Sequence, residues 1–98
     1  MSTNVLRTED RLDGTSNFSA WKERIEFLLV VNDVWELAST TITPLIDATK
    51  IEEHNKKDAK ARLLILDGVR DHIIPHILGK KIAREMWEAL KKLYQSDN

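Results

Sequence analysis

The fold of this 98-residue chain is decided by one stretch near its N-terminus, FSAWKERIEFLL, which occupies residues 18–29. Its apolar residues recur at steps of three and four, the spacing of one face of a helix, and charged residues fill the other face. The apolar face consists of Phe18, Trp21, Ile25, Leu28 and Leu29. Val30 and Val31 follow directly, so we expect the end of this helix to be buried on more than one side.

A second tryptophan-bearing stretch, IAREMWEALKKLY, occupies residues 82–94. It predicts a helix over roughly 81–94 with an apolar stripe and a second apolar row beside it. The stripe is Ile82, Met86, Leu90 and Leu93, and the row is Ala83, Trp87 and Tyr94. Tryptophans on such stripes are more typical of core packing than of ligand stacking, and the same interpretation applies to Trp21 and Trp35.

The residues between these two stretches are also helix-like. We expect a short helix over residues 34–38, and then a loop in which Thr43 is extended because proline follows it. A long helix is predicted from Asp47 or Thr49 to about residue 69. Its first half is polar and should project into solvent, whereas its second half is apolar and should enter the core. One helical turn over 71–78, ended by Gly79 as a C-cap, precedes the last helix.

Small polar residues mark the expected helix starts. Ser16 or Asn17 is predicted to cap the first helix and Asp33 the short one, because their side-chain oxygens accept an otherwise unpaired backbone N–H. The sequence therefore predicts an all-α fold, a small single-domain helical bundle of four main helices plus one or two short turns. We place a flexible N-terminal arm at residues 1–11, the helical domain at 12–96 and a tail at 97–98.

Composition narrows the functional classes. The 15 basic and 16 acidic residues give a net charge of −1, which provides no overall electrostatic attraction to nucleic acid. There is no cysteine, so disulfides and thiolate zinc sites are excluded. No apolar run approaches the roughly 20 residues that a membrane-spanning helix needs. We expect a cytoplasmic protein that does not contact a membrane.

The sequence holds no constellation of catalytic residues. His72 and His76 are spaced like two metal ligands on one helix face, but Pro75 lies between them and no third ligand is obvious beyond Asp71. The three glycines are too far apart to form a phosphate-binding loop. We therefore predict no catalytic residue, no metal, no cofactor and no small-molecule substrate, and we do not expect an enzyme.

One local charge asymmetry stands out. Between residues 80 and 92, five basic side chains are accompanied by only two acidic ones, Glu85 and Glu88. Such a run is usually the solvated face of an amphipathic helix, and the alternative is a weak contact with RNA phosphates. The basic residues are Lys80, Lys81, Arg84, Lys91 and Lys92.

Four segments in order are similar to a known family. Leu12-Asp13-Gly14, Asn17-Phe18, Trp21-Lys22 and residues 26–29 resemble the start of the Gag polyprotein of copia-type (Pseudoviridae) LTR retrotransposons, and Trp35-Glu36 resembles its second short helix. Residues 56–61 resemble its long central helix, and residues 83–94 its Ala-Lys-Glu-x-Trp-x-x-Leu-x-x-x-Tyr helix. The motif positions, interpreted as core, are Leu12, Gly14, Phe18, Trp21, Leu28, Trp35, Trp87, Leu90 and Tyr94.

This resemblance implies the N-terminal capsid domain of a Gag protein, or a host-adopted derivative, which self-associates into virus-like particles. In such families a downstream zinc knuckle usually handles the RNA, so RNA contact here is expected to be indirect or weak. The self-association surface is expected on exposed faces, with residues 52–60 and the arm at 2–11 as candidates. The alternatives are a stand-alone helical adaptor that binds Gag or another protein, and a weak RNA-binding module.

Overall fold

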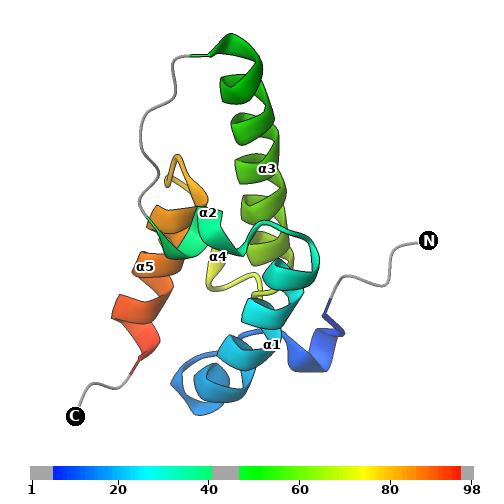
Figure 1. Cartoon of the computed structure of the whole chain (residues 1–98). Helices are drawn as coiled ribbons and strands as arrows, with labels where there is room; N and C mark the ends of the chain where they lie inside the picture. Colours follow the sequence, from blue (N-terminus) through cyan, green and yellow to red (C-terminus); the bar gives the residue numbers. More distant parts are fainter. Residues whose placement is uncertain (1–5, 41–46, 96–98) are drawn as a thin grey trace.

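Three long helices surround the core in the computed structural model, which describes residues 6–40 and 47–95 (Figure 1). They are α1 (Phe18–Val31), α3 (Ala48–Asp67) and α5 (Ala83–Tyr94). Two short helices, α2 (Trp35–Ser39) and α4 (Ile74–Ile77), and two 3-10 turns, η1 (Thr8–Asp10) and η2 (Thr15–Asn17), complete the described part, which contains no strand. The predicted all-α class is confirmed.

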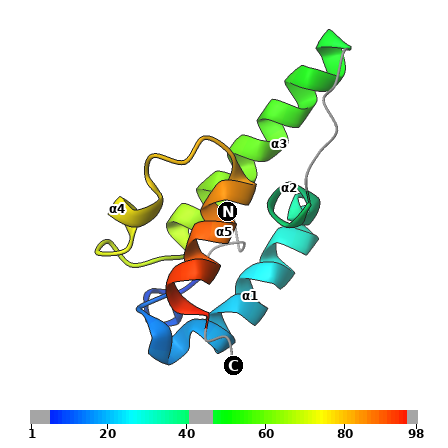
Figure 2. The ribbon, with the colours of Figure 1, turned by 90° about the vertical axis from the view of Figure 1, so that its left-hand side faces the viewer.

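Helix α5 packs against α2, α3 and α4, and α1 packs against α2 and α3. The first turns of α3 reach beyond the other helices (Figure 2), so the two halves of this helix have different surroundings. The half nearer Ala48 is mostly exposed, whereas the other half buries Ala61, Leu64 and Ile65. This division is the one that the polar and apolar halves of the sequence predict.

Aromatic rings form a connected chain through the core. Trp21 lies between Phe18 and Trp87, with ring centroids 5.8 Å apart in both pairs. Trp87 in turn meets Trp35 edge-on at 5.5 Å, and Phe18 meets Tyr94 at 6.3 Å. Such tilted and edge-on pairs add about 0.5–1.5 kcal/mol each beyond the burial of their area. The chain connects α1, α2 and α5, and it uses every aromatic residue of the sequence except Phe27.

The backbone carbonyl of Gly68, just after α3, joins three segments that are distant in sequence. The indole Nε1 of Trp21 donates to this oxygen at 2.6 Å, and the backbone N–H of Leu12 donates to it at 2.9 Å. A Cβ at position 68 would lie 3.0 Å from Cδ1 of Ile25 and 3.2 Å from the carbonyl oxygen of Leu64. Glycine therefore allows the close approach of α1 to the end of α3.

Asp58 is the only buried charged residue in the described part of the chain. Its carboxylate accepts hydrogen bonds from the backbone N–H of Ala83 at 3.0 Å and from Nε of Arg62 at 2.9 Å. Because Ala83 is the first residue of α5, a side chain of α3 caps the start of α5. The expectation that the whole polar half of α3 projects into solvent is wrong at this residue.

Two of the predicted helix caps are wrong. Asn17 precedes α1, but its side chain bonds backward, accepting from the N–H of Asp13 at 2.9 Å and donating to the carbonyl of Arg11 at 2.9 Å. Asp33 does not cap α2 either, because it lies in the left-handed region with φ of 61° and Val34 occupies the N-cap position. The side chain of Asn17 organises the turn before α1, whereas at Asp33 the backbone makes the turn and the carboxylate lies 3.6 Å from Nζ of Lys57.

Other boundary predictions have mixed outcomes. Asp47 does cap α3, since its Oδ1 accepts from the N–H of Thr49 at 2.8 Å and from that of Lys50 at 3.3 Å. Gly79 is not the C-cap of α4, because that position belongs to Leu78 and no described glycine lies in the left-handed region that such a cap uses. Thr43 lies outside the described residues.

We predict that Trp21→Ala lowers the free energy of unfolding by about 3–5 kcal/mol, because it empties the centre of the aromatic chain and removes the hydrogen bond to Gly68. Trp21→Phe, which keeps a ring, should cost less than the alanine variant. Urea denaturation measures both. Phe27→Ala is the matched control, because this ring lies 71% exposed on the same helix. Equal losses in Trp21→Ala and Phe27→Ala would contradict this account of the core.

We also predict that Asp58→Ala lowers the free energy of unfolding by about 1–2 kcal/mol, the usual effect of removing a capping side chain. Asp58→Asn should retain most of the stability, because its amide oxygen still accepts the hydrogen bond from Ala83. Thermal melting followed by circular dichroism compares the two variants with the unsubstituted protein. If Asp58→Ala melts at the same temperature as the unsubstituted protein, the contact between α3 and the start of α5 contributes nothing measurable to stability.

Candidate interaction surfaces

Helix α1 carries a second apolar face, which points away from the core. Phe27, Val30 and Val31 are 71%, 52% and 60% exposed, and they follow one another at steps of three and one. With 3.6 residues per turn, these positions lie on the side of the helix opposite to its buried residues, Trp21, Ile25 and Leu29. The expectation that Val30 and Val31 are buried is therefore wrong.

This outer face of α1, defined here as Phe27, Val30 and Val31, contrasts with the remaining exposed apolar side chains. Those are Ile51 and Leu63, 12 positions apart on α3, Leu78 after α4, and Ile82 and Leu93 near the two ends of α5. Isolated surface hydrophobes are ordinary, whereas adjacent large ones on one helix face indicate a contact surface. The exposure of Ile82 and Leu93 also corrects the stripe predicted for residues 82–94, which buries only Met86 and Leu90.

A second candidate surface is an open hollow of about 610 Å³ along α5. It contains four of the five basic residues that the sequence singled out, and Lys81 is the one that does not line it. Two carboxylates share the hollow, so its lining has four positive and two negative side chains. We call it the α5 groove, and its lining is Lys80, Arg84, Glu85, Glu88, Ala89, Lys91, Lys92 and Gln95.

The charges of the α5 groove are only partly paired. Nζ of Lys91 lies 3.3 Å from a carboxylate oxygen of Glu88, and Glu85 accepts a hydrogen bond from the backbone N–H of Lys81. Within residues 6–40 and 47–95, no carboxylate lies within ion-pair distance of the three remaining cations. Those cations are Lys80, Arg84 and Lys92. The groove therefore has a positive electrostatic potential that an anionic partner would feel.

None of the residues of the family motif belongs to either surface, and most of them form the interior. Five of them are buried: Leu12, Phe18, Trp21, Trp87 and Leu90. Three more are partly buried and pack against this core: Leu28, Trp35 and Tyr94. Gly14 lies outside the core in the turn before η2, and a Cβ built on it would meet no atom within 4 Å.

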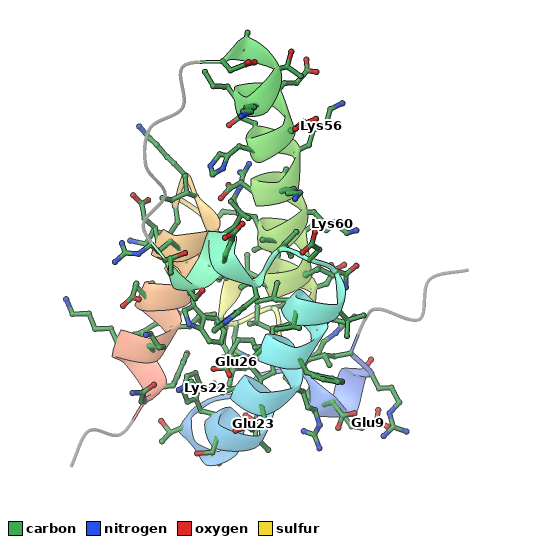
Figure 3. All side chains as sticks on the ribbon, viewed as in Figure 1. Glu9, Lys22, Glu23, Glu26, Lys56 and Lys60 are labelled. Carbon is green, nitrogen blue, oxygen red and sulfur yellow. The ribbon has the colours of Figure 1, made fainter. Side chains whose placement is uncertain are left out.

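The two surfaces that the sequence suggested for self-association have different environments. Residues 52–60 are exposed except for His54 and Asp58, and Lys56 and Lys60 extend outward from α3 (Figure 3). Of the N-terminal arm, residues 2–5 lie outside the described part. Leu6 packs against the core, and Nε of Arg7 bonds to Asp10 at 3.2 Å. Among their described residues, neither segment presents an apolar contact surface like that of α1.

No group of three or more His, Cys, Asp or Glu side chains suited to holding a metal ion occurs among the described residues. Nε2 of His72 lies 2.8 Å from the carbonyl oxygen of Asp13, and His76 is exposed at α4. Over the same residues, every helix is too short or too polar to cross a bilayer.

These features define an all-α domain whose exposed apolar face and basic groove suit contacts with other macromolecules. A family model described as the gag-polypeptide of LTR copia-type matches residues 25–98. This match covers most of the sequence, so the chain belongs to the copia-type Gag family. No curated protein and no solved structure matches the chain.

Proposed function

We propose that this domain is a structural unit of a copia-type Gag protein and that it acts by self-association into virus-like particles. Membership of the Gag family supports this structural role. The observation that carries the proposal is the exposure of Phe27, the one aromatic residue that the core chain excludes. In this proposal the domain has no catalytic role and assembles in the cytoplasm.

A second copy of this chain is the partner that we propose for the outer face of α1. Two α1 helices placed antiparallel about a twofold axis bring the same apolar side chains together, because an isologous contact uses one patch twice. A contact built on three side chains of one helix is small, so the pairing of isolated domains is weak. Repetition of a weak contact in a particle provides avidity without tight pairing of two copies.

We predict that the isolated domain associates reversibly as its concentration rises, and that a Phe27→Ser, Val31→Ser double variant weakens this association by tenfold or more. The substitutions remove the apolar contact but leave the core intact, since both side chains are mostly exposed. Sedimentation velocity over a concentration series measures the change. Leu78→Ser, which removes a comparably exposed side chain from another element, is the control. Association that is equal in all three proteins would exclude the outer face of α1 as the interface.

The α5 groove supports a second candidate function, the direct binding of RNA. The three cations without a carboxylate partner lie around one hollow, which suits contact with the phosphates of a single strand. In this candidate function the contact is weak and does not depend on the RNA sequence, because the groove contributes charge alone. None of its lining residues is aromatic, so none can stack on a base.

For this candidate we predict that the affinity for single-stranded RNA falls with salt, with a log–log slope of about −2, the value for three phosphate contacts. Arg84→Gln combined with Lys92→Gln should reduce the size of the slope by more than half. Fluorescence anisotropy with a labelled oligonucleotide measures the slope. Lys56→Gln with Lys60→Gln removes the same charge from α3 and should leave the slope nearly unchanged (Figure 3). No binding at low salt would rule out this candidate.

A further inference from the structure

The N-terminal segment is attached to the connection after α3 by a short backbone pairing. Leu12 and Val69 form an isolated parallel bridge, in which the N–H of Leu12 bonds to the carbonyl of Gly68 at 2.9 Å. The N–H of Arg70 bonds to the carbonyl of Leu12 at 3.0 Å. Because Arg11 and Arg70 each adjoin a residue of the bridge, two arginines are brought to the same region of the surface.

Both arginines line one open pocket of about 420 Å³. The other lining residues are Thr8, from η1, and Asp71 and His72, from the connection before α4. With His72 neutral, the lining has two positive charges and one negative charge. None of these five residues lines the α5 groove, so the two basic sites are separate.

The arginines of this pocket have unused hydrogen-bonding capacity. The Nε atoms of Arg11 and Arg70 are buried and have no hydrogen-bond partner among the described residues. Nε of Arg70 lies 3.6 Å from a carboxylate oxygen of Asp13, which is an ion pair but is too long for a hydrogen bond. Arg11 makes no ion pair with any described carboxylate. These Nε atoms are enclosed, so a ligand would be held by the outer nitrogens of the guanidinium groups, which are accessible because both arginines line the open pocket and the side chain of Arg70 is 42% exposed.

We propose that this pocket binds the phosphate group of a small phosphomonoester. A phosphate monoester carries nearly two negative charges on three oxygens, which two guanidinium groups can hold through paired N–H donors. A carboxylate ligand has only one negative charge and two oxygens, so it would pair less completely with two guanidinium groups than a phosphate does. The volume of about 420 Å³ exceeds that of a phosphate group, which leaves room for the group attached to it.

A ligand in this pocket links η1 to the residues that precede α4. It adds a bridge between the side chains of Arg11 and Arg70 to the two backbone hydrogen bonds that already join these segments. The proposed ligand therefore stabilises the attachment of the N-terminal segment to the domain. This inference is independent of self-association, since it involves no residue of the outer face of α1.

The test uses the whole 98-residue chain, labelled with nitrogen-15 and titrated at constant ionic strength with inorganic phosphate, AMP and glycerol phosphate. We expect shifts of the backbone amide signals of residues 8–12 and 70–72, with affinity in the millimolar range or tighter. Equal affinities for all three probes identify the phosphate group alone as the ligand, and a tighter fit for AMP identifies a nucleotide. Both results support the proposal.

Variants of Arg11 test whether this arginine holds the ligand. Arg11→Gln should weaken binding at least tenfold, and Arg11→Lys, which keeps the charge but loses the planar fork, should weaken it to a smaller extent. Lys60→Gln, an equal loss of charge on α3, should bind like the unsubstituted chain. The dispersion of amide signals in each variant verifies that it is folded. The proposal is overturned if residues 8–12 and 70–72 do not shift, if the shifts fall instead on the α5 groove, or if both Arg11 variants bind normally.

Discussion

The hydrogen bond from the indole of Trp21 to the carbonyl of Gly68 is the contact on which the remaining structure depends. It fixes α1 against the end of α3 at Gly68, where the absence of a side chain allows the two helices to approach closely. The same carbonyl holds Leu12, so the N-terminal segment is attached to the same point. Trp21 also contacts Trp87, and through it the orientation of α1 is transmitted to α5 and α2.

Helical periodicity was sufficient to predict the class of the fold and most of its interior. The buried positions of α1 are those that the spacing of Trp21, Ile25 and Leu29 selects. Periodicity failed at Val30 and Val31, because hydrophobicity alone does not tell which side of a helix its neighbours cover. It also failed at Asp58, whose partner is the backbone of a residue 25 positions later, and no local pattern shows such a pairing.

The candidate sites differ in how far the sequence reveals them. The basic residues of the α5 groove lie close together in the sequence, and the charge count over 80–92 was enough to find them. The pocket of Arg11 and Arg70 could not be found in this way, because the two arginines are 59 positions apart in the sequence and the bridge at Leu12 brings them together. The resemblance to Gag could not locate either site, because most of its motif positions lie in the core or against it.

The cap that Asp58 supplies has a consequence for α5 as a recognition element. The residue at the N-cap of α5, Ile82, makes no side-chain hydrogen bond to the helix, so the first turn of α5 takes its cap from α3. An excised peptide of residues 80–95 keeps the local contact of Glu85 with the N–H of Lys81 but loses the cap from Asp58, so the cations along α5 are aligned less firmly in the peptide than in the folded domain. The RNA binding proposed for this groove is thus a property of the folded domain and not of a linear basic motif.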